Sequence, residues 1–384
     1  MKQWVYSSHI YLKDEIFDGS MAIEYGKIVA FERGIHEGAK RYDDKRIIPG
    51  IIDTHNHGSY GWSMMEHTSK ESVQNFLKAV ASQGVTTVFP TTFPSPGEIG
   101  VEGIIDAMND EIVGAQIGGI HFEGPYLHRV GEKGVPVPKI DIDLNVVQEI
   151  IDACEGHLKV MGHAPELENS TQMIQLLLNH GVKAAITHTN ADATIAKRAF
   201  DDGITVSTHT GNVMTGIHHR DVGTLGMVLI DDRIMCEVIC DGMHLSLDMV
   251  KLIYKTVGAN RMMMISDCTE LSGLKPGTYG EIIVSADGFV KTKAGRLVGS
   301  SQPVLKGIQN LVEELHIPLT EVLKMSSFNQ AKFYNLSNKG YLDLNMDADF
   351  VVIDDDYKVV DTYVLGHNVY TQGNQILFNE IKMS

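Results

Sequence analysis

Six side chains that can bind a metal ion or move a proton follow short apolar stretches of this sequence. Two histidines lie in Asp53-Thr-His55-Asn-His57, and the other four residues are Glu123, His188, His209 and Asp267. Imidazole nitrogens and carboxylate oxygens are ligands for divalent ions such as Zn²⁺, Fe²⁺, Mn²⁺ or Co²⁺. A carboxylate beside such an ion can take a proton from water and pass it on. The residue types therefore predict metal-assisted hydrolysis, provided that the fold brings them together.

Each of these residues also has an ordinary structural interpretation when it is taken alone. His55 and His57 share one face of an extended strand, because alternate residues of a strand point the same way, but two such histidines can also be hydrogen-bonded side chains. Glu123 can cap a following helix, and His188 and His209 can be buried histidines with satisfied hydrogen bonds. The combination favours a metal site more strongly than any single residue does.

Asp267 ends the apolar run Met262–Asp267, MMMISD. A carboxylate cannot stay buried in such surroundings without a metal, a cation or a proton-transfer partner. We predict that Asp267 is the general base for a water molecule. The alternative is a structural aspartate that holds a ligand histidine in place.

The elements that must position these residues alternate between two kinds of pattern. Eight apolar stretches indicate strands: Ile48–His55, Val85–Thr91, Ile117–Glu123, Leu158–His163, Val182–His188, Thr205–His209, Ile234–Asp241 and Met262–Asp267. Helical patterns lie between most of them. This alternation predicts a (β/α)8 barrel of the TIM type, whose active sites lie at the carboxyl ends of the strands. The candidate residues occupy those ends.

Helical periodicity predicts the elements that surround the barrel. The first helix begins at a capping box, Thr68-Ser-Lys-Glu71. The other helices are expected at Leu144–Cys154, Thr171–His180, Ala193–Asp201, Ser246–Val257, Gln302–Leu315 and Leu319–Phe333. Leu127–Asp141 and Gly216–Thr224 are expected to form loops over the barrel mouth. Alternating strand patterns at both ends of the chain predict a small β-sandwich domain from residues 1–47 and 345–384, with the barrel at 48–344.

Composition narrows the possible partners and compartment. The formal net charge is −17, which argues against a nucleic-acid or anionic-membrane binder. The 4 cysteines form no CxxC pair, so neither a disulfide framework nor a thiolate metal site is expected. The first residues contain no apolar signal region, and no stretch is long enough to span a membrane. A cytoplasmic location is therefore expected.

Seven sequence motifs can be compared with known families. They are PGIIDTHNHG (49–58), HFEGPY (121–126), THTNA (187–191), HTGNVM (209–214), CDGMH (240–244), ISDCTELSG (265–273) and GSSQPVLKGIQNLVE (299–313). With these motifs in view, the chain resembles the N-acetylglucosamine-6-phosphate deacetylase family of the amidohydrolase superfamily. The HxH pair is general to the superfamily, whereas HFEGP followed by DGMH and SD is more specific to the family.

The resemblance implies an activity and a metal-ligand set. The family removes acetate from the amide of the sugar phosphate and leaves glucosamine 6-phosphate. By similarity, Glu123, His188 and His209 hold the main metal, and His55 and His57 add a second one. One or two divalent ions (Zn, Fe, Mn or Co) are therefore expected per subunit. Asp267 matches the acid/base aspartate of the family.

The resemblance also implies a substrate site shared between two subunits. His244 matches a histidine that contacts and orients the sugar phosphate, and Asn212 and the backbone of Val213 match phosphate contacts. Arg220 matches an arginine that reaches the phosphate from the neighbouring subunit, so a homodimer is expected. Guanidinium groups suit phosphate oxygens, although a solvated loop is the plainer interpretation of this segment.

Several sugar-facing positions depart from the family pattern and leave the substrate open. The family has a Lys-Gly-x-His stretch where this chain has Glu132-Lys-Gly-Val-Pro136, without histidine, and His163 is unexpected at the end of the fourth strand. Residues around Val135, Gly211 and His163 are expected to decide between the glucosamine substrate and its galactosamine epimer.

Two other functions stay open at this point. One is a cyclic amidase of the dihydroorotase kind, which would need a carboxylated lysine at the end of the fourth strand, whereas Lys159 lies near its start. The other is a metal-binding sugar-phosphate sensor without turnover. Such a sensor is expected to lack the base or a ligand, and this chain lacks neither.

Overall fold

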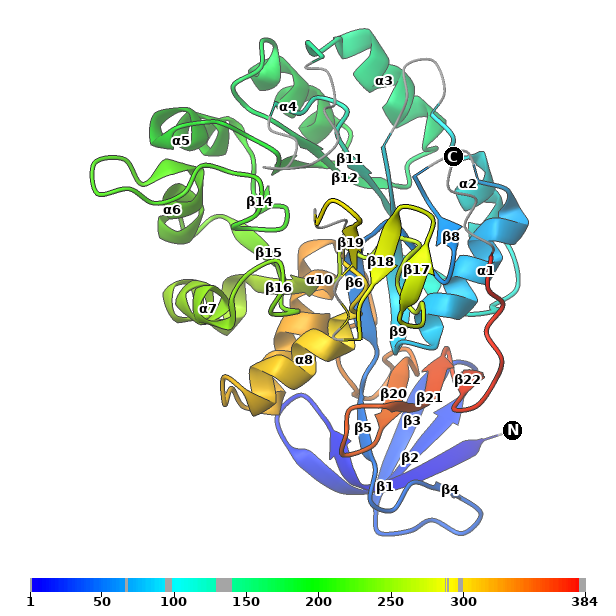
Figure 1. Cartoon of the computed structure of the whole chain (residues 1–384). Coiled ribbons are helices and arrows are strands. Elements are labelled where there is room, and N and C mark those ends of the chain that lie inside the picture. The colour runs from blue at the N-terminus through cyan, green and yellow to red at the C-terminus, as the bar shows by residue number, and fades with distance from the viewer. Residues whose placement is uncertain are drawn as a thin grey trace.

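The computed structural model of the chain (Figure 1) describes residues 2–65, 68–93, 99–128, 140–286, 288, 290–295 and 300–379. Its larger part is a barrel of parallel strands. These are β6 (Ile51–Asn56), β9 (Val85–Thr92), β11 (Ile120–Glu123), β12 (Leu158–His163), β13 (Lys183–Ile186), β14 (Val206–Ser207), β15 (Met235–Ile239) and β16 (Met262–Ile265). Each pairs with the next in this order, and the short strand β10 (Gln116–Ile117) also pairs with β9. All eight predicted strands are confirmed.

The two ends of this strand series meet at their carboxyl tips. The Asp267 amide donates to the His55 carbonyl at 3.0 Å, and the His57 amide donates to the Cys268 carbonyl at 2.7 Å. These bonds bring the first and last strands together. They also place two stretches with candidate site residues side by side.

Helices surround the barrel, as Figure 1 shows. They are α1 (Lys70–Ala81), α2 (Glu102–Met108), α3 (Leu144–Ala153), α4 (Ser170–Asn179), α5 (Ala193–Asp202), α6 (Gly223–Ile230), α7 (Leu247–Arg261) and α8 (Val304–Glu313). After α8 come α9 (Leu319–Leu323), the π-helical segment η1 (Lys324–Phe328) and α10 (Asn329–Phe333). The predicted helices are confirmed, whereas α2 and α6 were not predicted. The predicted loop at 216–224 ends where α6 begins, and most of the predicted loop at 127–141 lies outside the described residues.

The start of α1 differs from the predicted capping box by one residue. The N-cap is Ser69, whose backbone is extended (φ −72°, ψ 154°) and whose hydroxyl accepts a hydrogen bond from the Ser72 amide at 3.2 Å. The predicted cap, Thr68, is buried and its hydroxyl has no hydrogen-bond partner. The prediction of Thr68 is therefore wrong, because the chain turns into the helix one residue later.

Both ends of the chain form the small β domain, which confirms the predicted domain but not the two packed sheets of a sandwich. Its strands are β1 (Gln3–Tyr11), β2 (Ile16–Glu24), β3 (Lys27–Arg33), β4 (Lys40–Arg41), β5 (Arg46–Pro49), β20 (Phe350–Ile353), β21 (Val359–Val364) and β22 (His367–Thr371). They form a single hydrogen-bonded sheet in the order β22-β21-β20-β5-β1-β2-β3, with β4 beside β1. The antiparallel pair of β5 and β20 joins the two ends. The boundaries at 47/48 and 344/345 stay a prediction.

Two further small sheets were not predicted. Strands β7 (Gly58–Ser59) and β8 (Trp62–Ser63) form a short hairpin after β6. Strands β17 (Gly277–Tyr279), β18 (Ile282–Val284) and β19 (Val290–Thr292) form an antiparallel sheet, drawn in yellow in Figure 1. This sheet has a core of its own around Leu271 and Ile282. It stands in the connection from β16 to α8, which also carries Asp267.

The inside of the barrel has an apolar floor. Phe89, Val160, Val206, Met263 and Tyr334 pack together there and are buried. A separate and larger core lies between strands and helices. No helix in the described part of the chain is long and apolar enough to cross a membrane. The polar site residues lie above this floor, at the carboxyl end of the barrel.

Candidate active site

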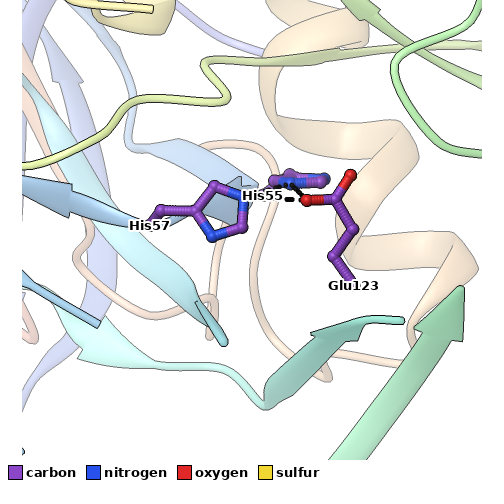
Figure 2. Close-up of side chains that lie close together, drawn as sticks. All are labelled: His55, His57 and Glu123. Carbon is purple, nitrogen blue, oxygen red and sulfur yellow. Dashed lines mark hydrogen bonds and ion pairs between the residues drawn. The ribbon is translucent and has the colours of Figure 1, made fainter. Parts of the chain in front are cut away.

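Four histidines converge on one carboxylate at the carboxyl end of the barrel. Glu123 Oε1 lies 2.9 Å from His188 Nε2 and 2.7 Å from His209 Nε2. Its other oxygen, Oε2, lies 3.1 Å from His57 Nε2 and 3.6 Å from His55 Nε2. Figure 2 shows His55, His57 and Glu123 pointing toward one another. The structure therefore brings together all five residues predicted as metal ligands.

Asp267 completes this cluster from the eighth barrel strand. Its Oδ1 lies 3.3 Å from His55 Nε2 and 3.4 Å from His57 Nε2. Asp267 therefore lies beside the HxH pair. A residue that exchanges protons with a water molecule at the HxH pair must occupy such a position.

Three residues of the cluster have the left-handed backbone conformation. The φ angles are 43° for His188, 33° for His209 and 51° for Asp267. This conformation costs a non-glycine residue about 1–3 kcal/mol and persists only where neighbouring structure enforces it. Each lies two residues after the end of its strand, where the chain turns away. The turn is what points these side chains into the barrel mouth.

Hydrogen bonds fix how the HxH histidines present their nitrogens. His57 Nδ1 lies 3.0 Å from the Thr91 carbonyl, so this nitrogen carries the proton and donates. His57 Nε2 then faces His55 Nε2 at 3.0 Å, and both side chains are buried. Two imidazole lone pairs at this distance repel each other unless a proton or a cation lies with them. The arrangement is that of ligands gathered around a positive charge.

The charges in the cluster shift several pKa values in opposite directions. Burial lowers the pKa of His57, but its hydrogen bonds with Asp267 and Glu123 outweigh burial and raise it to about 10. Burial raises the pKa of Glu123, but electrostatic interactions and hydrogen bonds with the surrounding histidines, His188 foremost, outweigh burial and hold it well below its usual range. The pKa of Asp267 is lowered in the same way, by His55 and by its hydrogen bond with His57. The carboxylates therefore stay ionised and the cluster attracts cations.

The donor atoms fit one or two divalent ions. His55, His57 and Glu123 each offer a ligand atom within 4.8 Å of one another, and so do Glu123, His188 and His209. Glu123 is common to both groups and turns a different oxygen toward each pair of histidines. A carboxylate placed in this way can bridge two ions.

A buried aspartate ties the first and last barrel strands together beneath the cluster. Asp53 accepts hydrogen bonds from the Ser266 hydroxyl at 2.6 Å, the Ser266 amide at 3.1 Å and Asn56 Nδ2 at 3.0 Å. These bonds fix the ends of the strands that carry His55 and Asp267. No role was predicted for Asp53, although it precedes the HxH pair in the sequence. Its position two residues before His55 on an apolar strand was the available signal.

His244 is held by Asp241 in the turn after β15. Its Nδ1 lies 2.8 Å from Asp241 Oδ2, and Asp241 Oδ1 also accepts from the amides of Met243 and His244. Burial lowers the pKa of His244, but the hydrogen bond and the charge of Asp241 outweigh it, so the pKa is raised. His244 therefore presents a fixed, readily protonated imidazole.

The predicted phosphate contacts lie in the segment after His209. The Val213 backbone is left-handed, at φ 49°, and its carbonyl accepts from the Thr189 amide at 3.0 Å. Asn212 Nδ2 is buried without a hydrogen-bond partner. Arg220 lies on an exposed turn closed by hydrogen bonds between His218 and Asp221. No described contact joins Arg220 to the cluster of its own chain.

One predicted specificity residue faces away from the site. His163 Nε2 lies 2.9 Å from the hydroxyl of Ser170, the first residue of α4, and the side chain is completely buried. Burial lowers the pKa of His163 to about 4. The expectation that His163 helps to select the sugar is therefore wrong, because its side chain packs between strand and helix. Val135 and the stretch Glu132–Pro136 lie outside the described residues.

The structure also locates Lys159, which the cyclic amidase alternative would need. It is the second residue of β12, and its side chain lies beside Gly119, just before β11 begins. It therefore lies at the opposite end of the strand from the cluster.

A second polar group inside the barrel escaped the sequence analysis. His121 and Glu237 are completely buried on β11 and β15, and with His55 they offer ligand atoms within 4.8 Å of one another. The signal for Glu237 was a charged residue inside the apolar run Met235–Ile239.

Comparisons with known proteins agree with this arrangement. A model of the amidohydrolase family matches residues 46–369. An N-acetylglucosamine-6-phosphate deacetylase of Danio rerio is 30% identical over 366 residues, covering 90% of this chain and 89% of that protein. The enzyme of the same name from Vibrio furnissii is 27% identical, covering 94% and 95%. An N-acetylgalactosamine-6-phosphate deacetylase of Escherichia coli O157:H7 is 29% identical, covering 91% and 94%.

Solved structures share the whole architecture. A mutant N-acetyl-D-glucosamine-6-phosphate deacetylase from Mycobacterium smegmatis, in complex with N-acetyl-D-glucosamine-6-phosphate, has a TM-score of 0.88 and 27% identity, covering 96% of this chain and 100% of that one. The N-acetylglucosamine-6-phosphate deacetylase from Thermotoga maritima has a TM-score of 0.78 and 29% identity, with the same coverage.

Proposed function

The chain belongs to the amidohydrolase family, and we propose that it hydrolyses the acetamide of N-acetylglucosamine 6-phosphate to glucosamine 6-phosphate and acetate. The observation that carries the proposal is the convergence of His55, His57, His188 and His209 on Glu123, with Asp267 beside them. The relatives named above act on this type of substrate and match almost the full chain, which supports the same reaction here.

Two divalent ions would be held by this cluster. Glu123 Oε1, His188 and His209 form the main site, and Glu123 Oε2, His55 and His57 form the second. The donor set of imidazoles and carboxylate suits Zn, Fe, Mn or Co. When bound, such an ion polarises the acetyl carbonyl and lowers the pKa of a water molecule to about 7. The side chains of the protein bind and orient the substrate and transfer the proton.

Asp267 is the general base and then the general acid. Its carboxylate has a lowered pKa and is ionised at neutral pH, so it can accept the proton of the attacking water. It then delivers that proton to the departing amine nitrogen, which leaves as the amine of the sugar. His244, oriented by Asp241, can donate to an oxygen of the substrate and orient the sugar phosphate.

The phosphate anchors the substrate away from the reacting amide. Asn212 and the Val213 backbone supply contacts from the same subunit, and the unpartnered Asn212 Nδ2 is free to donate to a phosphate oxygen. Arg220 stands on an exposed turn next to two histidines, so it can serve the site of a neighbouring subunit in a homodimer. Binding energy gathered at the phosphate then helps to orient the amide for reaction. A role in cytoplasmic amino-sugar metabolism follows from this substrate.

The galactosamine epimer is the second candidate substrate. The Escherichia coli relative named N-acetylgalactosamine-6-phosphate deacetylase is as similar to this chain as the relatives named N-acetylglucosamine-6-phosphate deacetylase are. The catalytic residues are the same for either epimer, so the difference would lie in the sugar pocket.

A comparison of kcat/KM on pure isomers tests the substrate assignment. We expect the gluco 6-phosphate to exceed the galacto and manno 6-phosphates, and each phosphorylated sugar to exceed its unphosphorylated form. A higher kcat/KM for the galacto 6-phosphate would show that the galactosamine epimer is the preferred substrate. Equal values with and without phosphate would contradict the proposed phosphate contacts.

A further inference from the structure

Beneath the metal-ligand cluster, three buried side chains each have one polar atom without a partner. These atoms are His55 Nδ1, His121 Nε2 and Glu237 Oε2. All three side chains are completely buried, and the rings of His55 and His121 are 4.5 Å apart between centroids. Buried polar atoms are nearly always hydrogen-bonded to protein or to ordered water. Three unpartnered atoms in one place therefore indicate a bound molecule.

The remaining hydrogen bonds determine which of these atoms donate. His121 Nδ1 donates to the Thr54 carbonyl at 2.9 Å, so His121 Nε2 carries a lone pair. Glu237 Oε1 accepts from the Thr54 hydroxyl at 2.7 Å and from the Tyr334 hydroxyl at 3.1 Å, and Oε2 is a further acceptor. A His55 that gives Nε2 to a metal ion keeps its proton on Nδ1 and donates there. One donor and two acceptors thus meet in the space between three side chains whose ligand atoms lie within 4.8 Å of one another.

We propose that one ordered water molecule occupies this space and that, through it, Glu237 positions the ring of His55. The water would accept from His55 Nδ1 and donate to His121 Nε2 and Glu237 Oε2, which satisfies all three atoms. Buried waters make about three such bonds. The proposal rests on the proposed second metal site, to which His55 belongs.

The strand geometry explains why Glu237 points inward. Its neighbours Cys236 and Val238 belong to the core between strands and helices, so Glu237 faces the barrel axis. Carboxylates that hold the second nitrogen of a ligand histidine fix its ring and increase its basicity. Glu237 is therefore a positioning residue rather than a catalytic one, since it lies beneath the cluster and acts through His55.

A third metal ion is a poorer occupant of the same space. His55 would have to bind ions through both nitrogens, which requires loss of its remaining ring proton and an imidazolate anion. Water makes no such demand.

A crystal structure of the metal-loaded wild-type protein tests the water directly. We expect a single density peak at hydrogen-bonding distance, about 2.6–3.2 Å, from His55 Nδ1, His121 Nε2 and Glu237 Oε2. An empty space there, or a peak with strong anomalous scattering at a metal edge, would overturn the proposal. This measurement does not depend on whether any variant folds.

Metal affinity tests the positioning role. In competition with a coloured chelator, Glu237→Gln should bind one of the two ions about 10- to 100-fold more weakly than wild type. The absorption spectrum of the cobalt-loaded protein should change with it. Tyr334→Phe is the matched control, because it removes a bond to the same carboxylate but leaves the charge and Oε2 in place. It should bind both ions as wild type does.

The outcomes separate this proposal from the proposed function. Wild-type protein that binds no ion would contradict the metal centre itself. Wild-type protein that binds two ions, with Glu237→Gln equal to it in affinity and cobalt spectrum, would overturn the role of Glu237 alone.

Discussion

At the scale of single residues, Asp267 has a strained backbone and an ionised side chain in the same place. Its φ of 51° is enforced by backbone bonds to His55 and Ser300 on either side. These bonds therefore hold the carboxylate beside the HxH pair, where the proposed reaction needs a base.

Asp267→Asn tests that base. The amide keeps the shape of the side chain but cannot accept a proton, so kcat should fall by about 10²- to 10⁴-fold. Acetate release measures the rate, and metal analysis of the same sample should show unchanged ion content. Activity within tenfold of wild type would rule out Asp267 as the acid/base residue.

The raised pKa of His57 predicts that metal binding releases a proton. Its pKa in the folded, metal-free protein is raised to about 10 from an ordinary value of 6.5. Its stabilising effect is thus fully present below about pH 6.5 and is lost as the pH rises through about 10. At about pH 8 a metal ion must displace the proton.

Calorimetric metal titrations in buffers of different ionisation enthalpy measure this release. We expect the apparent enthalpy at about pH 8 to depend on the buffer, with net proton release, and the release to shrink by about pH 10. A buffer-independent enthalpy at about pH 8 would contradict the raised pKa.

At the scale of elements, the sequence predicted the barrel strands better than their surroundings. Continuous apolar stretches such as Met262–Ile265 are buried along their whole length, and this leaves a clear pattern in the sequence. Helix α2 has 7 residues and no side-chain cap, so it carries little periodic signal. Strands β17 to β19 have 3 residues each, too few for an alternation to be recognised.

The site could be predicted because its residues end the strands, whereas Glu237 and His163 could not be assigned. A sequence gives the order of residues along a strand but not which face points inward when both faces are apolar. His163 was expected at the mouth and packs against α4. Glu237 was unnoticed and faces the barrel interior.

The one-residue difference at the start of α1 gives a matched pair of variants. Ser69→Ala removes the hydroxyl that accepts from the Ser72 amide, and should lower the free energy of unfolding by about 0.5–2 kcal/mol. Thr68→Val keeps the shape of the side chain and removes a hydroxyl that has no hydrogen-bond partner, so it should lower the free energy of unfolding much less. Chemical denaturation compares the two. A larger loss for Thr68→Val would restore Thr68 as the cap.

At the scale of the whole molecule, strands from both ends of the chain form one sheet on the barrel. Lys339 strengthens this attachment from the barrel side, with its ammonium 2.5 Å from Asp349 and 3.1 Å from Asp347. The histidine and carboxylate cluster lies at the carboxyl end of the barrel. The proposed dimer would complete the phosphate site there through Arg220.

Mixing two inactive variants tests the shared site. Asp267→Asn and Arg220→Ala should each lose most activity, the first through the base and the second through phosphate binding. After the subunits exchange, a mixed dimer combines an intact Asp267 with an intact Arg220 of the partner subunit, so part of the activity should return. If no activity returns although mass spectrometry confirms that the subunits have exchanged, Arg220 acts in the site of its own subunit or lies outside the site.

The most direct test of the whole account is acetate release from N-acetylglucosamine 6-phosphate before and after chelation. We predict rapid release by the metal-loaded protein, loss of activity on removal of the ions, and recovery as divalent metal is returned. Release that persists in protein shown to be metal-free would contradict the role of the histidine cluster. No release from fully loaded protein would contradict the proposed reaction.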